Sequence, residues 1–229
     1  MDVSDTLNGI GVLERYMRKS REETAQTRQR IVEAGAIEFR RNGVTATGLA
    51  DVMAAAGLTH GGFYRHFDSK DALVKECLAN ALDSLRASIE SATATRPGRA
   101  GVLSAVDDYL STGHRDSEAC CPFVTLGSEL ARASRDVREA ATAAFLKLAD
   151  VIAGHLDGLP RPAAKKEALT LLSTMVGAMT MARLVSDSEV SATILARARK
   201  SLSQQVQNSV PLLATHVDRR RRRARGAAR

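Results

Sequence analysis

Residues 57–70 read GLTHGGFYRHFDSK, and this stretch decides how the rest of the chain is interpreted. A short apolar helical pattern over residues 49–56 comes directly before it. Gly57 suits a turn position with positive φ, and Thr59 suits the N-cap of a second helix that runs to about Phe67. A helix, a tight turn and a second helix with a small, hydrogen-bonding outer face are typical of a helix-turn-helix that meets a DNA groove.

The adjacent glycines Gly61 and Gly62 are unexpected in a helix. Each is about 1 kcal/mol less favourable than alanine in a helix interior. The major groove of B-DNA admits one helix, whose first turns approach the base edges. We therefore interpret the pair as space for close approach of the backbone to DNA. Taken alone, two adjacent glycines would indicate only a turn.

Side chains that bind phosphate or base edges surround this pair. Thr59 and His60 lie at the start of the predicted helix, and Tyr64 and His66 lie later in it. Lys70 lies near the start of the next helix, where its charge adds to the free backbone amides. Each of these residues alone has an ordinary surface explanation. Their combination after a matched first helix and turn predicts DNA binding.

Two aromatic residues have a different predicted role. Phe63 and Phe67 are four residues apart, so they share one face of a helix. We expect them to face inward and to hold the predicted recognition helix against the core.

The remaining chain is patterned as helices throughout. A helix over residues 24–42 precedes the motif and ends at a left-handed cap at Gly43, and Thr45 or Thr47 can cap the helix at 49–56. A helix over about 71–95 follows, and an Arg-Pro-Gly-Arg linker comes after it. Five further helices are expected at about 101–114, 122–133, 135–157, 163–186 and 189–214. No strand-like alternation is sustained, so the sequence predicts an all-α fold.

The net charge of +7 is unevenly distributed. Residues 218–229 contribute +6 and residues 18–70 contribute +3, whereas residues 71–217 sum to zero. A basic excess confined to the motif and the tail favours a nucleic-acid partner, and the balanced middle suits a ligand or dimer module. We expect a flexible extension at 1–20, a DNA-binding domain at 21–70, a helical effector-binding and dimerisation domain at 71–217, and a disordered tail at 218–229.

Composition limits the alternatives. With 44% hydrophobic residues, 3% aromatic residues and no Trp, the core is built from aliphatic side chains, which favours helices. Three cysteines without a signal peptide indicate a reducing cytoplasm. The most apolar window, residues 168–185, is too short and too polar to cross a bilayer. No catalytic set, phosphate loop or metal cluster is evident, so we expect neither an enzyme nor a cofactor.

Residues 27–70 closely resemble the N-terminal domain of the TetR/AcrR family of bacterial transcriptional repressors. The resemblance rests on the helix around Ile31 to Phe39 and on five further matches, namely Thr47, Asp51-Val52, Gly57-Leu58-Thr59, Phe63-Tyr64-Arg65-His66-Phe67 and Lys70. It implies an all-α homodimer with three N-terminal helices that bind a palindromic operator, and a C-terminal helical domain that binds an effector.

The resemblance also implies a set of DNA contacts. Positions that match Thr47, Thr59, His60, Gly61, Tyr64, His66 and Lys70 commonly contact DNA in the family, and we add Gly62. The family often has lysine where this chain has His60, and a hydroxyl-bearing or larger residue where it has Gly62. These departures concern base preference.

From the resemblance as a whole, repression is the predicted function, and a DNA-binding dimer without any effector is the alternative.

The stretch Cys120-Cys121-Pro122-Phe123, followed by Ser128-Glu129, is the second informative segment. Pro122 suits the first position of a helix, which places Cys121 near the N-cap, where amide dipoles lower a thiol pKa. The segment resembles electrophile- and oxidant-sensing repressors within the family. Inert packing of the thiols is the alternative, and metal ligation with His114 nearby is a third.

Two further expectations concern the C-terminal half. Met175 and Met179 are candidates for lining an effector pocket, with core packing as the alternative. By resemblance, the last two helices pair with their mates in a homodimer, where Gly177 and Ala178 allow close approach. The apolar residues expected there are Leu169, Leu172, Val176, Met179, Ile194, Leu195, Ala198 and Leu202.

Overall fold

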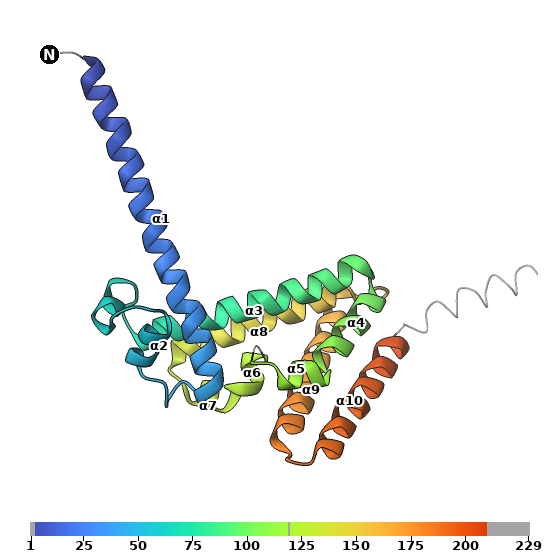
Figure 1. The fold of residues 1–229 in the computed structure, drawn as a ribbon. Helices are drawn as coiled ribbons and strands as arrows, with labels where there is room; N and C mark the ends of the chain where they lie inside the picture. Colours follow the sequence, from blue (N-terminus) through green and yellow to red (C-terminus); the bar gives the residue numbers. More distant parts are fainter. Residues whose placement is uncertain (1–2, 119, 210–229) are drawn as a thin grey trace, which may run out of the picture. The chain divides into compact units, whose positions relative to one another are not determined.

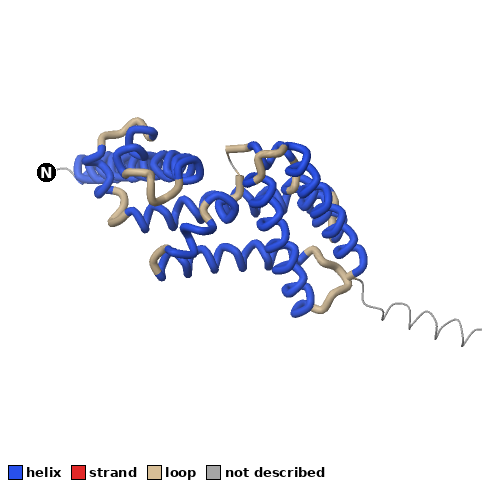
Figure 2. Tube along the Cα trace, turned by 90° about the horizontal axis from the view of Figure 1, so that it is seen from below, coloured by secondary structure: helices blue, strands red, loops and turns tan. Residues whose placement is uncertain are grey.

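The computed structural model describes the backbone of residues 3–118 and 120–209, and the side chains of residues 21–118 and 120–209. Within these ranges the chain forms helices and loops and contains no strand (Figure 2). This confirms the predicted all-α class. The predicted tail at 218–229 lies outside the described residues.

The helices follow one another along the chain as shown in Figure 1. The N-terminal elements are α1 (Val3–Asn42), α2 (Leu49–Ala55), the 3-10 helix η1 (His60–Arg65) and α3 (Lys70–Thr95). The later elements are α4 (Arg99–Tyr109), α5 (Thr112–Asp116), α6 (Pro122–Thr125), α7 (Gly127–Arg132), α8 (Arg135–Gly154), α9 (Arg161–Leu184) and α10 (Ser188–Asn208).

Several predicted boundaries differ from the observed ones. Helix α1 begins at Val3, whereas periodicity predicted a helix only from Thr24. Residues 1–16 show little apolar periodicity, so the pattern of the sequence does not indicate a helix there. The helix predicted at 101–114 is two helices, because the Ser111 hydroxyl accepts from the His114 amide at 3.1 Å and starts a new one.

The chain divides into two compact units. Unit 1 comprises residues 1–81 and 126–141, and unit 2 comprises residues 82–125 and 142–229. Helices α3 and α8 each contribute to both units. The predicted domain limits at 21–70 and 71–217 stay a prediction.

Unit 1 is built around the turns that position η1. Gly43 and Gly57 have φ of +85° and +69°, so both predicted left-handed positions are confirmed. The N-cap of α2 is Gly48, not Thr45 or Thr47 as predicted, and the Asp51 carboxylate accepts from the Gly48 amide at 2.9 Å. The core of unit 1 includes Ile31, Phe39, Val52, Met53, Phe63, Phe67 and Leu73, all buried.

Unit 2 is organised around the antiparallel pair α9 and α10, which run side by side and are joined at one end (Figure 1). Helix α10 also packs against α4, and α5 and α6 pack against α9. The face of α9 that meets these helices is aliphatic and buried at Ala168, Leu171, Leu172, Met175 and Met179. The buried residues of α10 include Leu195, Leu202 and Val206.

Candidate nucleic-acid interface and effector region

Element η1 is held on the core of unit 1 by its aromatic residues. Phe63 is 0% exposed and Phe67 is 2% exposed, and their rings stack with centroids 5.6 Å apart. Burying two phenylalanines contributes roughly 1.5–3 kcal/mol each. The predicted inward role of both residues is confirmed, and the opposite side of η1 is free for a ligand.

The predicted recognition helix is a 3-10 helix from His60 to Arg65, not an α-helix that runs to Phe67. Two glycines disfavour an α-helix of this length, and the tighter turn suits a short segment. Thr59 takes the predicted N-cap position, although its hydroxyl makes no capping hydrogen bond. In a 3-10 helix residues three apart are eclipsed, so Gly61 and Tyr64 lie one above the other.

Neither glycine of the pair is required by the interior of unit 1. Both have φ outside the left-handed region. A Cβ placed on Gly61 would meet no atom of another described residue within 4 Å. A Cβ placed on Gly62 would lie 3.5 Å from the Met53 Cε, which is an ordinary contact. Among the described residues, the space in front of Gly61 is therefore open.

The predicted DNA contacts fall into two groups. Thr59, His60 and Gly61 are exposed, Gly62 and Lys70 are half-buried, and Tyr64 is 65% exposed. The structure brings these six residues together on η1 and at the start of α3. His66 is half-buried, and its Nδ1 is buried without a hydrogen-bond partner among the described residues.

Thr47 is placed differently from the other predicted contacts. It is 2% exposed, and its hydroxyl donates to the Gly43 carbonyl at 2.7 Å and to the Glu38 carbonyl at 3.3 Å. These bonds tie the end of α1 to the loop that leads into α2. Its contact with DNA stays a prediction, and the geometry gives it a role in positioning that loop.

Two arginines of α1 hold the turn in place, and the sequence pattern indicates neither of them. Arg28 lies 4.0 Å from the Phe67 ring centroid, donates to the His66 carbonyl and pairs with Glu76. Arg30 donates from Nη2 to the Ala56 carbonyl at 2.5 Å. Each arginine therefore holds a backbone carbonyl at one edge of the helix-turn-helix. Helical spacing within α1 could not identify these partners, because they lie far along the chain.

Segment 126–141 docks onto the rest of unit 1 through polar contacts. The Glu129 carboxylate accepts from the Val44 amide at 2.6 Å and from the Thr45 amide at 3.1 Å. The Ser134 hydroxyl donates to the Asp71 carboxylate at 2.6 Å. Charge-assisted bonds to two backbone amides order the loop between α1 and α2. The sequence pattern does not indicate this role of Glu129, because its partners lie more than 80 residues earlier in the chain.

The cysteine segment is buried in unit 2. Cys120 and Cys121 are both buried and unbridged, and Pro122 begins α6 as predicted. Burial raises the pKa of the Cys121 thiol, although the Tyr109 hydroxyl and the Phe123 and Val124 amides act to lower it. The predicted effect of the helix N-terminus is thus present but outweighed by desolvation. This balance favours the packing interpretation, and thiol sensing stays a prediction.

We expect slow alkylation of these thiols in the folded protein. Burial also raises the pKa of Cys77, to about 12, so little thiolate is present at pH 8 at any of the three positions. N-ethylmaleimide labelling, followed by mass spectrometry at pH 8, is expected to be at least about tenfold slower in native protein than in urea. Equal rates in the two conditions would contradict this assignment.

The two candidate methionines are core residues of α9. Met175 and Met179 are 2% and 0% exposed, and neither lines the cleft of unit 2 described below. Pocket lining by these residues stays a prediction. Among the described side chains, no three His, Cys, Asp or Glu residues are grouped so that they could hold a metal ion. Within the same ranges, none of the helices has the length and apolar character needed to cross a membrane.

Taken together, α2, the glycine turn and the anchored η1 with its exposed polar side define a helix-turn-helix regulator. Residues 31–77 match the family model described as bacterial regulatory proteins, tetR family. Residues 102–197 match the model described as transcriptional regulator LmrA/YxaF-like, C-terminal domain. The chain belongs to the TetR family of bacterial transcriptional regulators.

Related proteins support this assignment, and their alignments cover different fractions of the chain. An uncharacterised HTH-type transcriptional regulator of Mycobacterium tuberculosis is 30% identical over 173 residues, which cover 70% of this chain and 86% of the relative. The HTH-type transcriptional regulator TtgR of Pseudomonas putida is 42% identical over 62 residues, 27% of this chain. That match spans only 30% of the length of TtgR.

A solved structure shows the same fold. A TetR transcriptional regulator from Chloroflexus aurantiacus superposes with a TM-score of 0.70 at 26% identity. The superposition covers 82% of this chain and 98% of that one. The likeness therefore extends beyond the helix-turn-helix to the helices of the C-terminal half.

Proposed function

We propose that the protein is a homodimeric repressor in the cytoplasm that binds a palindromic DNA operator and leaves it when a small molecule binds unit 2. The observation that carries the DNA-binding part is the exposed side of η1. There Gly61 faces open space, Tyr64 stands above it, and the buried rings of Phe63 and Phe67 hold the element in place. Each protomer would present one such element to one half-site in the major groove.

The character of the surface around η1 supports specific contacts over bulk attraction. The exposed or half-buried groups include a hydroxyl, an imidazole, a phenol and the Lys70 ammonium. No carboxylate pairs with Lys70 among the described residues, so its charge is available to a phosphate. Arg28, in contrast, is already occupied by Glu76 and the His66 carbonyl.

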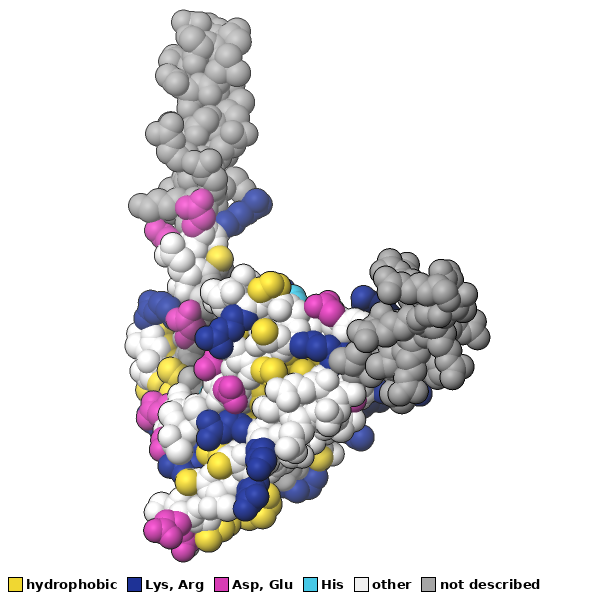
Figure 3. Space-filling model, turned by 90° about the vertical axis from the view of Figure 1, so that its right-hand side faces the viewer, with side chains coloured by type: hydrophobic (Ala, Val, Ile, Leu, Met, Phe, Trp, Pro, Cys, Tyr) yellow, Lys and Arg dark blue, Asp and Glu magenta, His cyan; other side chains and the backbone are white. Residues whose placement is uncertain are grey.

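Dimerisation is supported by an exposed face of α9. Ser173, Gly177, Met181 and Leu184 recur at helical spacing and are exposed, Leu184 to 72%. Figure 3 shows hydrophobic side chains at the surface toward the end of unit 2 where α9 and α10 join. A second copy of this chain would cover these side chains.

The predicted interface residues are distributed differently. Half of the eight are buried inside unit 2, namely Leu172, Met179, Leu195 and Leu202, and the other four are half-buried. The buried four serve the intramolecular core, which was the alternative to dimer contact. The exposed side chains of α9 are therefore the better candidates for the dimer interface.

We expect Tyr64→Phe and Lys70→Ala to weaken binding to all operator sequences alike. Removing one hydrogen bond or ion pair to phosphate loses about 1 kcal/mol or more, because these contacts position the protein without reading bases. An operator is first selected from random duplexes with the parent protein, and affinities are then measured by fluorescence anisotropy. Lys147→Ala, on the exposed surface of α8, is the matched control. Unchanged affinity in both variants would contradict the proposed interface.

The alternative function is a DNA-binding dimer without an effector. A polar cleft in unit 2, described below, favours an effector-controlled protein. A thiol-reactive effector is tested separately, by adding N-ethylmaleimide to the operator complex of the parent and of Cys121→Ser. Equal release from both proteins would exclude a switch at Cys121.

A further inference from the structure

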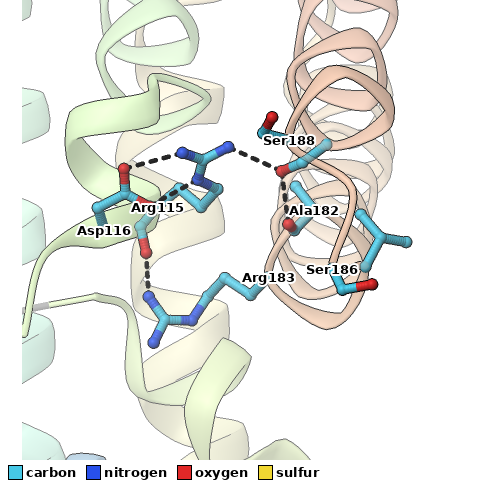
Figure 4. A pocket seen from close by; sticks show the side chains of 8 residues that line it. Arg115, Asp116, Ala182, Arg183, Ser186 and Ser188 are labelled. Carbon is cyan, nitrogen blue, oxygen red and sulfur yellow. Dashed lines mark hydrogen bonds and ion pairs between the residues drawn. The ribbon is translucent and has the colours of Figure 1, made fainter.

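Unit 2 contains a polar cleft between α5 and the joined ends of α9 and α10. Its volume is about 400 Å³, which is within the size range of small-molecule sites. The polar side chains that line it are Arg115, Asp116, Arg183, Ser186, Ser188 and Ser191. Figure 4 shows Arg115 reaching from α5 toward the α9–α10 end and Arg183 reaching back from α9 toward α5.

Arg115 makes three side-chain hydrogen bonds at this cleft. Its guanidinium binds the Asp116 carboxylate through two parallel bonds of 2.7 and 2.8 Å, and it donates to the Ser191 hydroxyl at 2.8 Å. Ser191 in turn donates to the Ala182 carbonyl at 2.6 Å. The side chain of Arg115 is only 19% exposed. Because its charge is balanced by Asp116, Arg115 forms part of the wall of the cleft.

The lining contains two arginines and one aspartate, so the cleft carries one net positive charge. Arg183 donates to the Arg115 carbonyl and interacts with the charge of Asp116, but no carboxylate lies within ion-pair distance of it among the described residues. One guanidinium nitrogen of Arg183 is thus bonded to the wall of the cleft, and Figure 4 shows the guanidinium beside Arg115 and Asp116. A guanidinium in this state is suited to bind a carboxylate or phosphate oxygen.

A buried polar atom near Arg183 also lacks a partner. The His114 Nε2 is buried without a hydrogen bond among the described residues, and the His114 ring lies 4.8 Å from the ring of Tyr109. Tyr109 is almost fully buried, with an exposed fraction of 5%. Burial lowers the pKa of His114, and the charge of Arg183 lowers it further. His114 is therefore neutral at pH 7, and the positive charge at this corner is that of the arginines.

We propose that this cleft binds a small organic anion, with Arg183 as its counter-charge, and that occupancy of the cleft lowers operator affinity. The anionic group would accept hydrogen bonds from the Arg183 guanidinium and from the Ser186 or Ser188 hydroxyl. The rest of the ligand would lie against Ala182 and Val185, the apolar residues of the lining. The effector role rests on the proposed repressor function, whereas anion binding itself does not.

The binding experiment uses the full chain without DNA. Sodium benzoate, its neutral isostere benzamide and inorganic phosphate are titrated by calorimetry against the parent protein, Arg183→Gln and Arg183→Lys. We expect an anion to bind the parent at least about tenfold more tightly than Arg183→Gln, because one charge-assisted contact is lost. Arg183→Lys keeps the positive charge but lacks the paired N–H donors of the guanidinium, so its affinity for the anion should lie between those of the parent and Arg183→Gln. Benzamide should not bind.

Matched controls separate this site from general salt effects. Arg197→Gln removes an exposed arginine from α10 and should bind like the parent. Circular dichroism confirms that each variant is folded. Binding of benzoate but not phosphate, or the reverse, identifies the anionic group and supports the site. Equal binding of every anion to the parent and Arg183→Gln, or no binding at all, overturns it.

A second measurement tests the effector role with the operator selected above. The bound anion should weaken operator affinity of the parent at least about tenfold, the ratio expected for a coupling free energy in the usual range for allostery. The operator complex of Arg183→Gln should not respond. Anion binding without any change in operator affinity would overturn the effector role. Failure of the parent to bind any DNA would instead overturn the proposed function and leave the calorimetry unaffected.

Discussion

Replacing Gly61 by alanine is expected to weaken operator binding by at least about tenfold, which corresponds to about 1.4 kcal/mol, without destabilising the fold. Gly61 lies on the exposed side of η1, and its missing side chain faces open space. A methyl group there would separate the backbone of η1 from the base edges or phosphates of the groove, and every contact made by its neighbours would lengthen.

The folding stability of Gly61→Ala should increase or stay unchanged, although its operator affinity falls. A Cβ at Gly61 meets no described neighbour, and the backbone φ is one that alanine adopts without strain. Alanine restricts the unfolded chain more than glycine, which contributes about 0.4–1 kcal/mol to folding. A glycine at a position where alanine would be more stable indicates an external constraint.

Two assays on one pair of variants separate these effects. Operator affinity is measured by anisotropy and stability by urea unfolding, for Gly61→Ala and for Gly154→Ala. Gly154 ends α8 and is exposed, and a Cβ there likewise meets no described atom within 4 Å, so its substitution should leave operator affinity unchanged. If Gly61→Ala binds the operator as tightly as the parent, close approach at this position is wrong.

The helix-turn-helix could be predicted from sequence because its determinants are local. Gly57 must provide a left-handed turn, and Phe63 and Phe67 are four residues apart, so spacing alone identifies their shared role. The 3-10 character of η1 was missed because an amphipathic pattern of six residues does not distinguish two helix types. The start of α1 could not be predicted because residues 1–16 show little apolar periodicity.

The contacts that hold the motif in place could not be predicted in the same way. Arg28 and Arg30 act on carbonyls at the far side of the turn, and Glu129 acts on amides 85 and 84 residues earlier in the chain. Such pairings depend on tertiary packing. Likewise, the position of Cys121 beside a helix start predicted a lowered pKa, but its burial, which depends on the whole of unit 2, reverses the balance.

Replacing Gly177 by leucine is expected to convert the proposed dimer into a monomer. Gly177 lies in the middle of α9, where glycine is about 1 kcal/mol less favourable than alanine. Its position is exposed, and a Cβ there meets no described atom within 4 Å. As with Gly61, nothing in the described part of the chain requires the glycine. A partner helix that packs against α9 at close range would require it.

The leucine side chain should be accommodated in a single protomer but should block the packing of the second protomer. Within one protomer it points into open space and improves helix propensity, so thermal stability of the monomer is retained. Between protomers it would separate α9 from its mate and from the Met181 and Leu184 side chains alongside. A monomer contacts one half-site only, and losing the linked second contact weakens operator binding by about 100-fold or more.

Light scattering coupled to size exclusion measures the mass of Gly177→Leu and of the control Gly154→Leu, and anisotropy measures the operator affinity of both. The control should remain dimeric and bind as the parent does. A dimeric Gly177→Leu would place the interface elsewhere on α9 and α10. A monomer with full operator affinity would mean that one η1 suffices for binding. The mild charge of residues 18–70 argues against this outcome, because a net charge of +3 provides little nonspecific attraction to DNA. The two substitutions thus test different interfaces: Gly61 leaves space where DNA is expected to bind, and Gly177 leaves space where the second protomer is expected to pack.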